Sequence, residues 1–227
     1  MNWNQKRSGA RERYAAKYNS DEAAAYDAYV GNLSPADETA YLSDLQQVFQ
    51  FKPGMQVLDV GAGSGTICKI LHQLDSLALT ALEPSRAMLD LLRNKPSLKE
   101  VKCVEGYCDA EADRDHFPAS YFDVIVSRQL VNGLFDPLTA FANWYHWLKP
   151  TGAVVAIDGF YGRNAWTGTF EEEVDLLPLS STQSLATLPY LLEKSGFDVV
   201  SVNLMTATNQ MPATRTTRYV VVARKPL

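Results

Sequence analysis

The chain has 227 residues, 46% of them hydrophobic and 21% charged, so it can bury a large core and is neither disordered nor collagen-like. It contains 21 Lys and Arg residues against 26 Asp and Glu residues, a formal net charge of -5. This balance argues against duplex nucleic acid as the main partner, because basic side chains that neutralise phosphates supply most of the non-specific affinity.

The cysteines and the apolar segments exclude further classes. Cys68, Cys103 and Cys108 are odd in number and lack Cys-x-x-Cys spacing, which predicts neither a metal site nor a disulfide framework. The basic N-terminal residues precede no apolar signal-peptide region, and no run of about 18 apolar residues would span a membrane. We therefore expect a cytoplasmic protein without a membrane partner.

The first part of the chain is predicted to be helical. Residues 1 to about 30 are rich in Ala, Tyr and charged residues, which favours one or two short helices. A stronger helix is expected to begin with Ser34 as N-cap and Pro35 at its first position, and to end before Lys52-Pro53-Gly54. The early tyrosines have two interpretations, a lid over a ligand or ordinary packing; they are Tyr14, Tyr18, Tyr26 and Tyr29.

The next part alternates between expected strands and helices. The strands are expected at 56–60, 77–82, 101–104, 122–126 and 153–157, and the helices at 65–74, 85–93 and 137–148. This alternation is typical of right-handed βαβ units, which form a parallel sheet covered on both faces. After a helix over 182–194, strands over 199–205 and 218–223 follow without a predicted helix between them, which indicates an antiparallel hairpin at the sheet edge.

A glycine-rich turn follows the first strand. Residues 57–66 read Val-Leu-Asp-Val-Gly-Ala-Gly-Ser-Gly-Thr, so Gly61, Gly63 and Gly65 let a ligand approach the start of the next helix. Glu83 ends the second strand, where a carboxylate can accept hydrogen bonds from ribose hydroxyls. A dinucleotide-binding Gly-x-Gly-x-x-Gly loop would need glycine at the position of Thr66. The spacing therefore favours a ligand that has a ribose but no pyrophosphate.

With this motif and order of elements, the chain resembles the class I S-adenosylmethionine-dependent methyltransferases. The segments that carry the resemblance are Val57 to Thr66, Ala81 to Ser85, Gly106 to Asp109, Tyr121 to Ser127 and Trp147 to Gly152. The resemblance implies an α/β, Rossmann-like sheet of seven strands in the order 3-2-1-4-5-7-6, with the last strand antiparallel and helices on both faces. It also implies one domain, divided into an N-terminal helical lid (1–33), a cofactor-binding core (34–158), a substrate-shaping insertion (159–180) and a C-terminal helix and hairpin (181–227).

The resemblance further implies S-adenosyl-L-methionine as the cofactor. Gly61 and Gly63 are expected at its amino-acid part and Glu83 at its ribose hydroxyls. Asp109 is expected to bind the adenine amine, with Tyr107 or Glu111 as alternatives. The complete set of expected cofactor-binding residues is Asp59, Gly61, Ala62, Gly63, Gly65, Glu83, Pro84, Ser85, Asp109, Ala110, Ser127 and Arg128.

The acceptor is expected to be a small molecule. The fourth strand ends without the Asn-Pro-Pro-Tyr-like motif of base-amine methyltransferases, and the chain has no Pro-Cys nucleophile. Asp158 is a candidate catalytic carboxylate at the end of the fifth strand, or simply a cap of the turn at Gly159. Tyr14, Tyr18, Tyr161 and Trp166 are candidate substrate residues. Aromatics beside Glu171-Glu172-Glu173 would suit an amine or aromatic acceptor, unless these acids form a solvated surface.

Three functions remain in competition. The first is methyl transfer to a nitrogen or oxygen of a small molecule, which is a direct displacement and needs alignment more than a catalytic base. The second is non-catalytic binding of S-adenosylmethionine. The third, a nicotinamide-dependent oxidoreductase, is disfavoured by Thr66.

Overall fold

A mixed β-sheet forms the centre of the protein. The computed structural model describes residues 3–31, 33–166, 171 and 174–227. The sheet has seven strands in the order β3-β2-β1-β4-β5-β7-β6, which confirms the predicted order. The strands are β1 (Gln56–Val60), β2 (Ala78–Glu83), β3 (Lys102–Glu105), β4 (Phe122–Arg128), β5 (Leu148–Gly159), β6 (Asp198–Leu204) and β7 (Arg218–Arg224). β1 to β5 pair in parallel, whereas β7 lies antiparallel to both β5 and β6.

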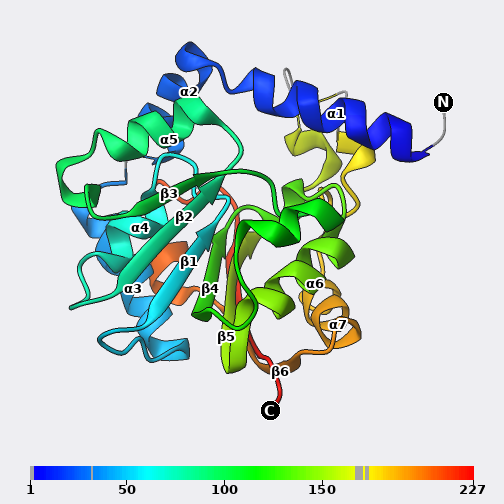
Figure 1. The fold of residues 1–227 in the computed structure, drawn as a ribbon. Helices are drawn as coiled ribbons and strands as arrows, with labels where there is room; N and C mark the ends of the chain where they lie inside the picture. The colour runs from blue at the N-terminus through cyan, green and yellow to red at the C-terminus, as the bar shows by residue number, and fades with distance from the viewer. Residues whose placement is uncertain (1–2, 32, 167–170, 172–173) are drawn as a thin grey trace.

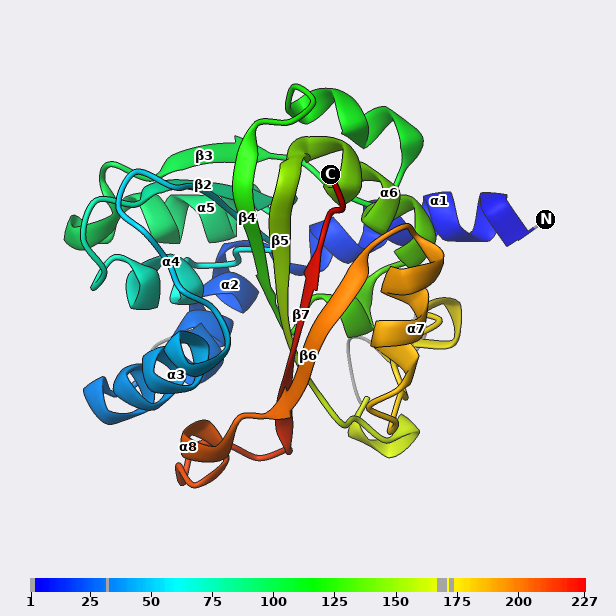
Figure 2. The ribbon, with the colours of Figure 1, turned by 90° about the horizontal axis from the view of Figure 1, so that it is seen from below.

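Helices cover both faces of this sheet, as Figure 2 shows from below. One face carries α3 (Pro35–Val48), α4 (Thr66–Leu71) and α5 (Arg86–Arg93); the other carries α6 (Pro137–Trp147) and α7 (Thr187–Lys194). Ser34 caps α3 as predicted, since its Oγ accepts a hydrogen bond from the backbone N–H of Asp37 at 3.2 Å. The crossovers therefore place every parallel strand's carboxyl end at the same edge of the sheet.

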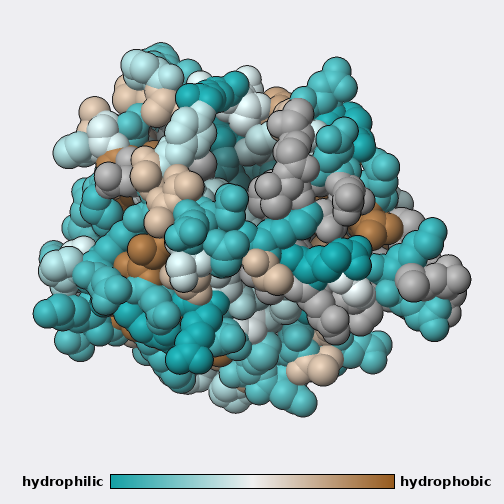
Figure 3. All heavy atoms as spheres, turned by 90° about the horizontal axis from the view of Figure 1, so that it is seen from above, coloured by the Kyte–Doolittle hydropathy of each residue, from teal (hydrophilic) through white to brown (hydrophobic). Residues whose placement is uncertain are grey.

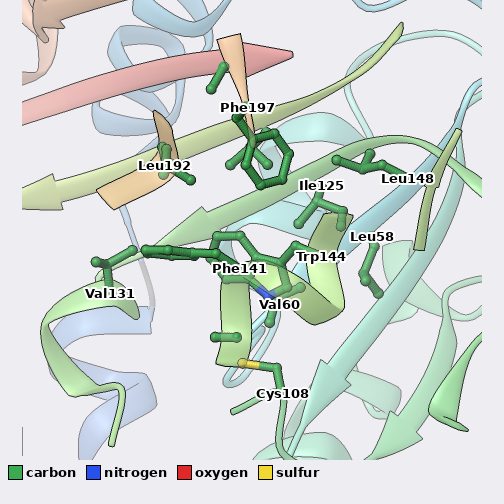
Figure 4. Packing of buried hydrophobic residues seen from close by; sticks show 14 of the residues in the cluster. Leu58, Val60, Cys108, Ile125, Val131, Phe141, Trp144, Leu148, Leu192 and Phe197 are labelled. Atoms are coloured by element: carbon green, nitrogen blue, oxygen red, sulfur yellow. The ribbon is translucent and has the colours of Figure 1, made fainter. Parts of the chain in front are cut away.

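Each face has its own hydrophobic core. The core under α6 and α7 is rich in aromatic side chains, and Figure 4 shows Phe141 and Trp144 packed among Leu58, Ile125 and Leu192. Phe141 and Trp144 are fully buried. Truncating such a side chain to alanine typically costs about 3 to 5 kcal/mol, so this core holds α6 rigidly against the sheet.

Several predicted boundaries differ from the observed elements. The helix expected over 65–74 spans only Thr66–Leu71, the one expected over 182–194 begins at Thr187, and β5 begins earlier than expected, at Leu148. The prediction that no helix separates the last two strands is wrong, because α8 (Thr206–Asn209) lies there. Asp44 of α3 accepts hydrogen bonds from the backbone N–H groups of Ala207 (3.1 Å) and Thr208 (2.8 Å), a tertiary cap that local sequence does not reveal.

The N-terminal helices lie across the carboxyl ends of the strands (Figure 1). They are α1 (Trp3–Lys17) and α2 (Ser20–Tyr26), followed by a π-helical turn over Asp27–Gly31. Lys95 fixes this turn to the glycine loop, because its Nζ lies 2.8 Å from Asp27 Oδ1 and 2.7 Å from the carbonyl oxygen of Ser64. Figure 3 views the same face from above, where the coloured residues are mainly hydrophilic. Within the described ranges, no helix combines the length and apolar character needed to cross a bilayer.

Candidate functional site

The glycine loop turns through left-handed backbone conformations at the end of β1. Gly61, Gly63 and Gly65 have φ values of +67°, +53° and +89°, which side-chain-bearing residues rarely adopt. A Cβ on Gly61 would lie 2.7 Å from the Leu130 side chain, whereas a Cβ on Gly63 would meet nothing within 4 Å. Gly61 is therefore required by packing, while Gly63 presents its backbone to open space.

Glu83, at the end of β2, is bonded to this loop. Its Oε2 accepts a hydrogen bond from the Gly63 N–H at 3.0 Å, and its Oε1 accepts one from the Ser85 N–H at 2.9 Å. Burial raises the pKa of Glu83 to about 7, although both backbone hydrogen bonds act to lower it. Because a carboxylate has about four acceptor positions, two remain for ligand hydroxyls.

A cavity that is partly open to solvent lies where the glycine loop, β2 and β4 meet. Apolar side chains line one part of it: Leu82, Met88, Leu134 and Phe135. Its polar lining residues are Tyr18, Tyr26, Glu83, Tyr107, Asp109, Arg128 and Gln129. An apolar slot with a carboxylate at its rim fits a nucleoside whose base is apolar on both faces and whose ribose carries hydroxyls.

Asp109 lines the cavity beside Phe135 and contacts α1. Its Oδ2 accepts hydrogen bonds from the backbone N–H groups of Phe135 (2.7 Å) and Asp136 (3.2 Å). Its Oδ1 is buried, and Nη2 of Arg11 lies 3.1 Å from it. The Arg11 guanidinium also lies 4.4 Å from the centre of the Tyr107 ring, whose hydroxyl donates to the Arg11 carbonyl oxygen at 2.6 Å. The carboxylate predicted to meet an adenine amine thus also holds the first helix.

The structure brings only part of the predicted cofactor set to the cavity surface. Those that line the cavity are Gly61, Gly63, Glu83, Pro84, Asp109 and Arg128, together with the predicted substrate residue Tyr18. The others, Asp59, Ala62, Gly65, Ser85, Ala110 and Ser127, are not among its lining residues.

Two of these residues hold neighbouring elements of the site in place through hydrogen bonds. Asp59 accepts a hydrogen bond from Cys68 Sγ at 3.3 Å, and burial raises the pKa of Asp59 to about 7. Ser85 Oγ accepts from the Met88 N–H at 3.2 Å, which caps α5, and donates to the Tyr18 carbonyl oxygen at 3.0 Å.

The candidate catalytic carboxylate Asp158 lies away from this cavity. It accepts hydrogen bonds from the backbone N–H groups of Gly159 (2.7 Å) and Asn132 (3.0 Å), and it borders a separate, smaller cavity beside α7. This geometry matches the turn-capping interpretation. Burial raises the pKa of Asp158 to about 6.

The remaining predicted substrate residues are dispersed. Trp166 donates through Nε1 to the Ser180 carbonyl oxygen at 2.7 Å and packs against the small hydrophobic cluster that contains Ala10 of α1, Phe135 and Leu177. Tyr161 hydrogen-bonds with Gln129 next to the cavity. The side chain of Tyr14 lies outside the described residues, as do residues 172–173 of the acidic run.

Sequence reasoning missed two basic residues near the site, Arg11 and Arg218. Arg218 begins β7 and precedes a run of apolar residues, so a buried charge at a strand end was the available signal. Arg11 gave no such signal, because charged residues surround it in a helix of low hydrophobicity.

Among the described residues, no group of three His, Cys, Asp or Glu side chains is arranged to bind a metal. Tyr190 and Lys194 have the Tyr-x-x-x-Lys spacing of some oxidoreductases, but Tyr190 is 56% exposed on α7 and does not line the cavity.

Comparisons with known proteins agree with this geometry. Residues 58–156 match a family model described as a methyltransferase domain. Phosphoethanolamine N-methyltransferase 3 of Arabidopsis thaliana is 30% identical over 128 residues, which cover 56% of this chain and 24% of that protein. The chloroplastic 2-methyl-6-phytyl-1,4-hydroquinone methyltransferase of the same plant is 32% identical over 126 residues, or 55% of this chain and 36% of that protein. The chain thus spans well under half the length of these two relatives.

A solved structure also shares the fold. Phosphoethanolamine N-methyltransferase 2 of Haemonchus contortus, in complex with S-adenosyl-L-methionine, superposes with a TM-score of 0.68 at 20% identity, covering 93% of this chain and 58% of that chain. Together with the family match, this confirms the predicted resemblance to the class I S-adenosylmethionine-dependent methyltransferases.

Proposed function

We propose that this chain, whose residues 58–156 match a methyltransferase domain, is an enzyme that transfers the methyl group of S-adenosyl-L-methionine to a nitrogen or oxygen of a small molecule. The observation that carries the proposal is the position of Glu83. Its carboxylate lies at the cavity rim, bonded to the Gly63 N–H, with acceptor positions left for two ribose hydroxyls.

The residues fit such a cofactor at both of its ends. The open space over Gly63 admits a ligand where a side chain would intrude. Buried Oδ1 of Asp109 provides an acceptor for an adenine amine, with Leu134 and Phe135 beside it to contact the base. When bound, the cofactor would supply an electrophilic methyl group on its sulfonium, with the neutral thioether as the leaving group.

The protein's contribution to this reaction is alignment and exclusion of water. Asp158 does not line the cavity, so we assign it no role in proton transfer. A neutral amine would need no base for attack. Tyr18 and Tyr26 lie over the cavity from the N-terminal segment, which we propose acts as the lid expected over residues 1–33.

The test compares ligands and then turnover. A thermal shift should appear with S-adenosylmethionine or S-adenosylhomocysteine and be absent with NAD, because a ligand stabilises only the protein that binds it. Release of S-adenosylhomocysteine in the presence of small amines and phenols then separates an enzyme from a non-catalytic binding protein. A shift with NAD alone would overturn the proposal.

A further inference from the structure

Two arginines lie at the same edge of the sheet, beside the proposed cofactor cavity. Arg128 ends β4, and Arg218 begins β7, which runs antiparallel, so both stand at the carboxyl edge of β5. Arg128 donates from Nε to the Tyr41 hydroxyl at 3.3 Å, with its guanidinium 5.2 Å from the ring centre. Arg218 donates from Nη1 to the hydroxyl of Tyr161. Arg128 itself lines the cavity.

Neither guanidinium has a carboxylate partner among the described residues. Other basic side chains of the chain do: Lys95 pairs with Asp27 at 2.8 Å and Lys149 with Asp123 at 2.8 Å. Arg218 is 8% exposed, and its buried Nε donates no hydrogen bond within the described part of the chain. A buried cation without a counter-charge is costly, so an arrangement of this kind is typical of a site that an anion completes.

Two buried carboxylates interact electrostatically with this pair, but neither is within ion-pair distance of it. The charge of Arg128 acts to lower the pKa of Asp59, and the charge of Arg218 acts to lower the pKa of Asp158. Each carboxylate, however, already has hydrogen-bond partners of its own. Burial nevertheless raises the pKa of Asp59 to about 7 and that of Asp158 to about 6. Near neutral pH Asp59 is therefore only partly ionised, whereas Asp158 is largely ionised but already accepts two backbone hydrogen bonds.

The hydroxyl of Tyr161 links Arg218 to Gln129, the residue that follows Arg128 in the chain. It accepts hydrogen bonds from Gln129 Nε2 at 2.8 Å and from Arg218 Nη1. These two hydrogen bonds occupy both lone pairs of the hydroxyl oxygen. Its own proton must then point toward another acceptor. Gln129 also lines the cofactor cavity, so the cluster of Arg128, Gln129, Tyr161 and Arg218 is continuous with it.

We propose that the methyl acceptor carries an anionic group, a phosphate or a carboxylate, which binds to Arg128, Arg218 and the Tyr161 hydroxyl. This inference rests on the proposed methyltransferase function and names the substrate class of the same site. Arginine favours such oxyanions because its planar group of N–H donors matches their geometry. The anion fixes one end of the acceptor, so that a nitrogen or oxygen at its other end can face the cofactor. An amino acid or amino phosphate would combine this anchor with the amine expected from the sequence.

The test is a calorimetric titration of inorganic phosphate, and separately of acetate, into protein saturated with S-adenosylhomocysteine. We expect millimolar binding of at least one anion, weakened at least about tenfold in Arg218→Gln. Arg224→Gln is the matched control, because Arg224 lies at the other end of β7 and is exposed. It should bind the anion within about twofold of the unmodified protein, since it loses the same charge without touching the cluster. Preference for phosphate or for acetate identifies the kind of anionic group.

The outcomes separate the two proposals. If S-adenosylhomocysteine does not bind, the proposed function fails. If it binds but neither anion does, or if Arg218→Gln binds the anion as tightly as Arg224→Gln, the anionic acceptor is wrong. Retained affinity of Arg218→Gln for S-adenosylhomocysteine shows that the variant is folded. Should it not fold, Tyr161→Phe decides: it keeps the ring, removes the hydroxyl, and should weaken anion binding severalfold; unchanged binding would overturn the inference.

Discussion

Arg11 of α1 lies 3.1 Å from Asp109, the carboxylate expected to bind the adenine amine, and 2.8 Å from Asp113. One side chain therefore connects the N-terminal helix to the lining of the cavity. A ligand amine at Asp109 would share this carboxylate with Arg11. The first helix and the proposed cofactor would thus be coupled through a single acceptor.

Arg11→Ala should speed both association and dissociation of the cofactor. Loss of hydrogen bonds from a charged donor costs about 1.5 to 3 kcal/mol, which would open α1 more often and raise both rates about tenfold. Stopped-flow fluorescence with S-adenosylhomocysteine measures these rates. Lys6→Ala, an exposed change in the same helix, serves as the control. If both variants bind at the unmodified rates, α1 does not gate the cavity.

Gly63→Ala should abolish cofactor binding without unfolding the protein. Its φ of +53° adds strain of about 1 to 2 kcal/mol, and its Cβ would enter the open space over the loop. Gly54→Ala is a close control. Gly54 has a φ of +83°, and a Cβ added there would meet no atom within 4 Å. It precedes β1, at the opposite edge of the sheet. Calorimetry should detect cofactor binding only in the Gly54 variant, while thermal denaturation shows a similar loss of stability in both. Normal affinity of Gly63→Ala would exclude the loop as the cofactor site.

Cofactor affinity should increase with pH because of Glu83. Burial raises the pKa of Glu83 to about 7, from an unfolded value of 4.5, and ribose hydroxyls donate best to its charged form. Binding therefore releases a proton, and affinity should rise about tenfold between about pH 6 and about pH 8. Calorimetric titrations in buffers of different ionisation enthalpy measure the number of protons released on binding.

Glu83→Gln separates the effect of Glu83 on the pH dependence from any effect of Asp59. This is needed because burial also raises the pKa of Asp59 to about 7. The variant should bind more weakly by about 2 to 3 kcal/mol at the higher pH, because two hydroxyls lose a charged acceptor. Its affinity should also be nearly independent of pH. A variant that keeps the full pH dependence would place the titrating group elsewhere.

Local patterns predict the sheet and the glycine loop well, because strand alternation and the φ > 0 requirement of Gly61 and Gly63 act within a few residues. They predict poorly what distant segments bring together. α8 depends on Asp44, a carboxylate of α3. The arginine cluster depends on β4 ending and β7 beginning beside the carboxyl end of β5. Asp158 was placed correctly at a strand end, but the side of the sheet edge that it faces follows from Asn132, a partner far along the chain.

Asp158→Asn should leave methyl transfer intact while changing the pH dependence of stability. Burial raises the pKa of Asp158 to about 6, from an unfolded value of 3.8. Stability from such a group is fully present below the unfolded pKa and is lost as pH rises through the folded pKa. Asparagine cannot ionise, and its single oxygen can accept from only one of the two backbone N–H groups that Asp158 holds.

The variant should therefore be less stable than the unmodified protein at about pH 4, and this difference should narrow by on the order of 2 to 3 kcal/mol by about pH 7. Urea denaturation at several pH values measures the change in the free energy of unfolding. Turnover should stay within about twofold, because Asp158 caps a turn rather than facing the cofactor cavity. A folded variant whose kcat falls a hundredfold or more, with unchanged cofactor affinity, would return Asp158 to the role of catalytic base and require the acceptor to enter from the smaller cavity beside α7.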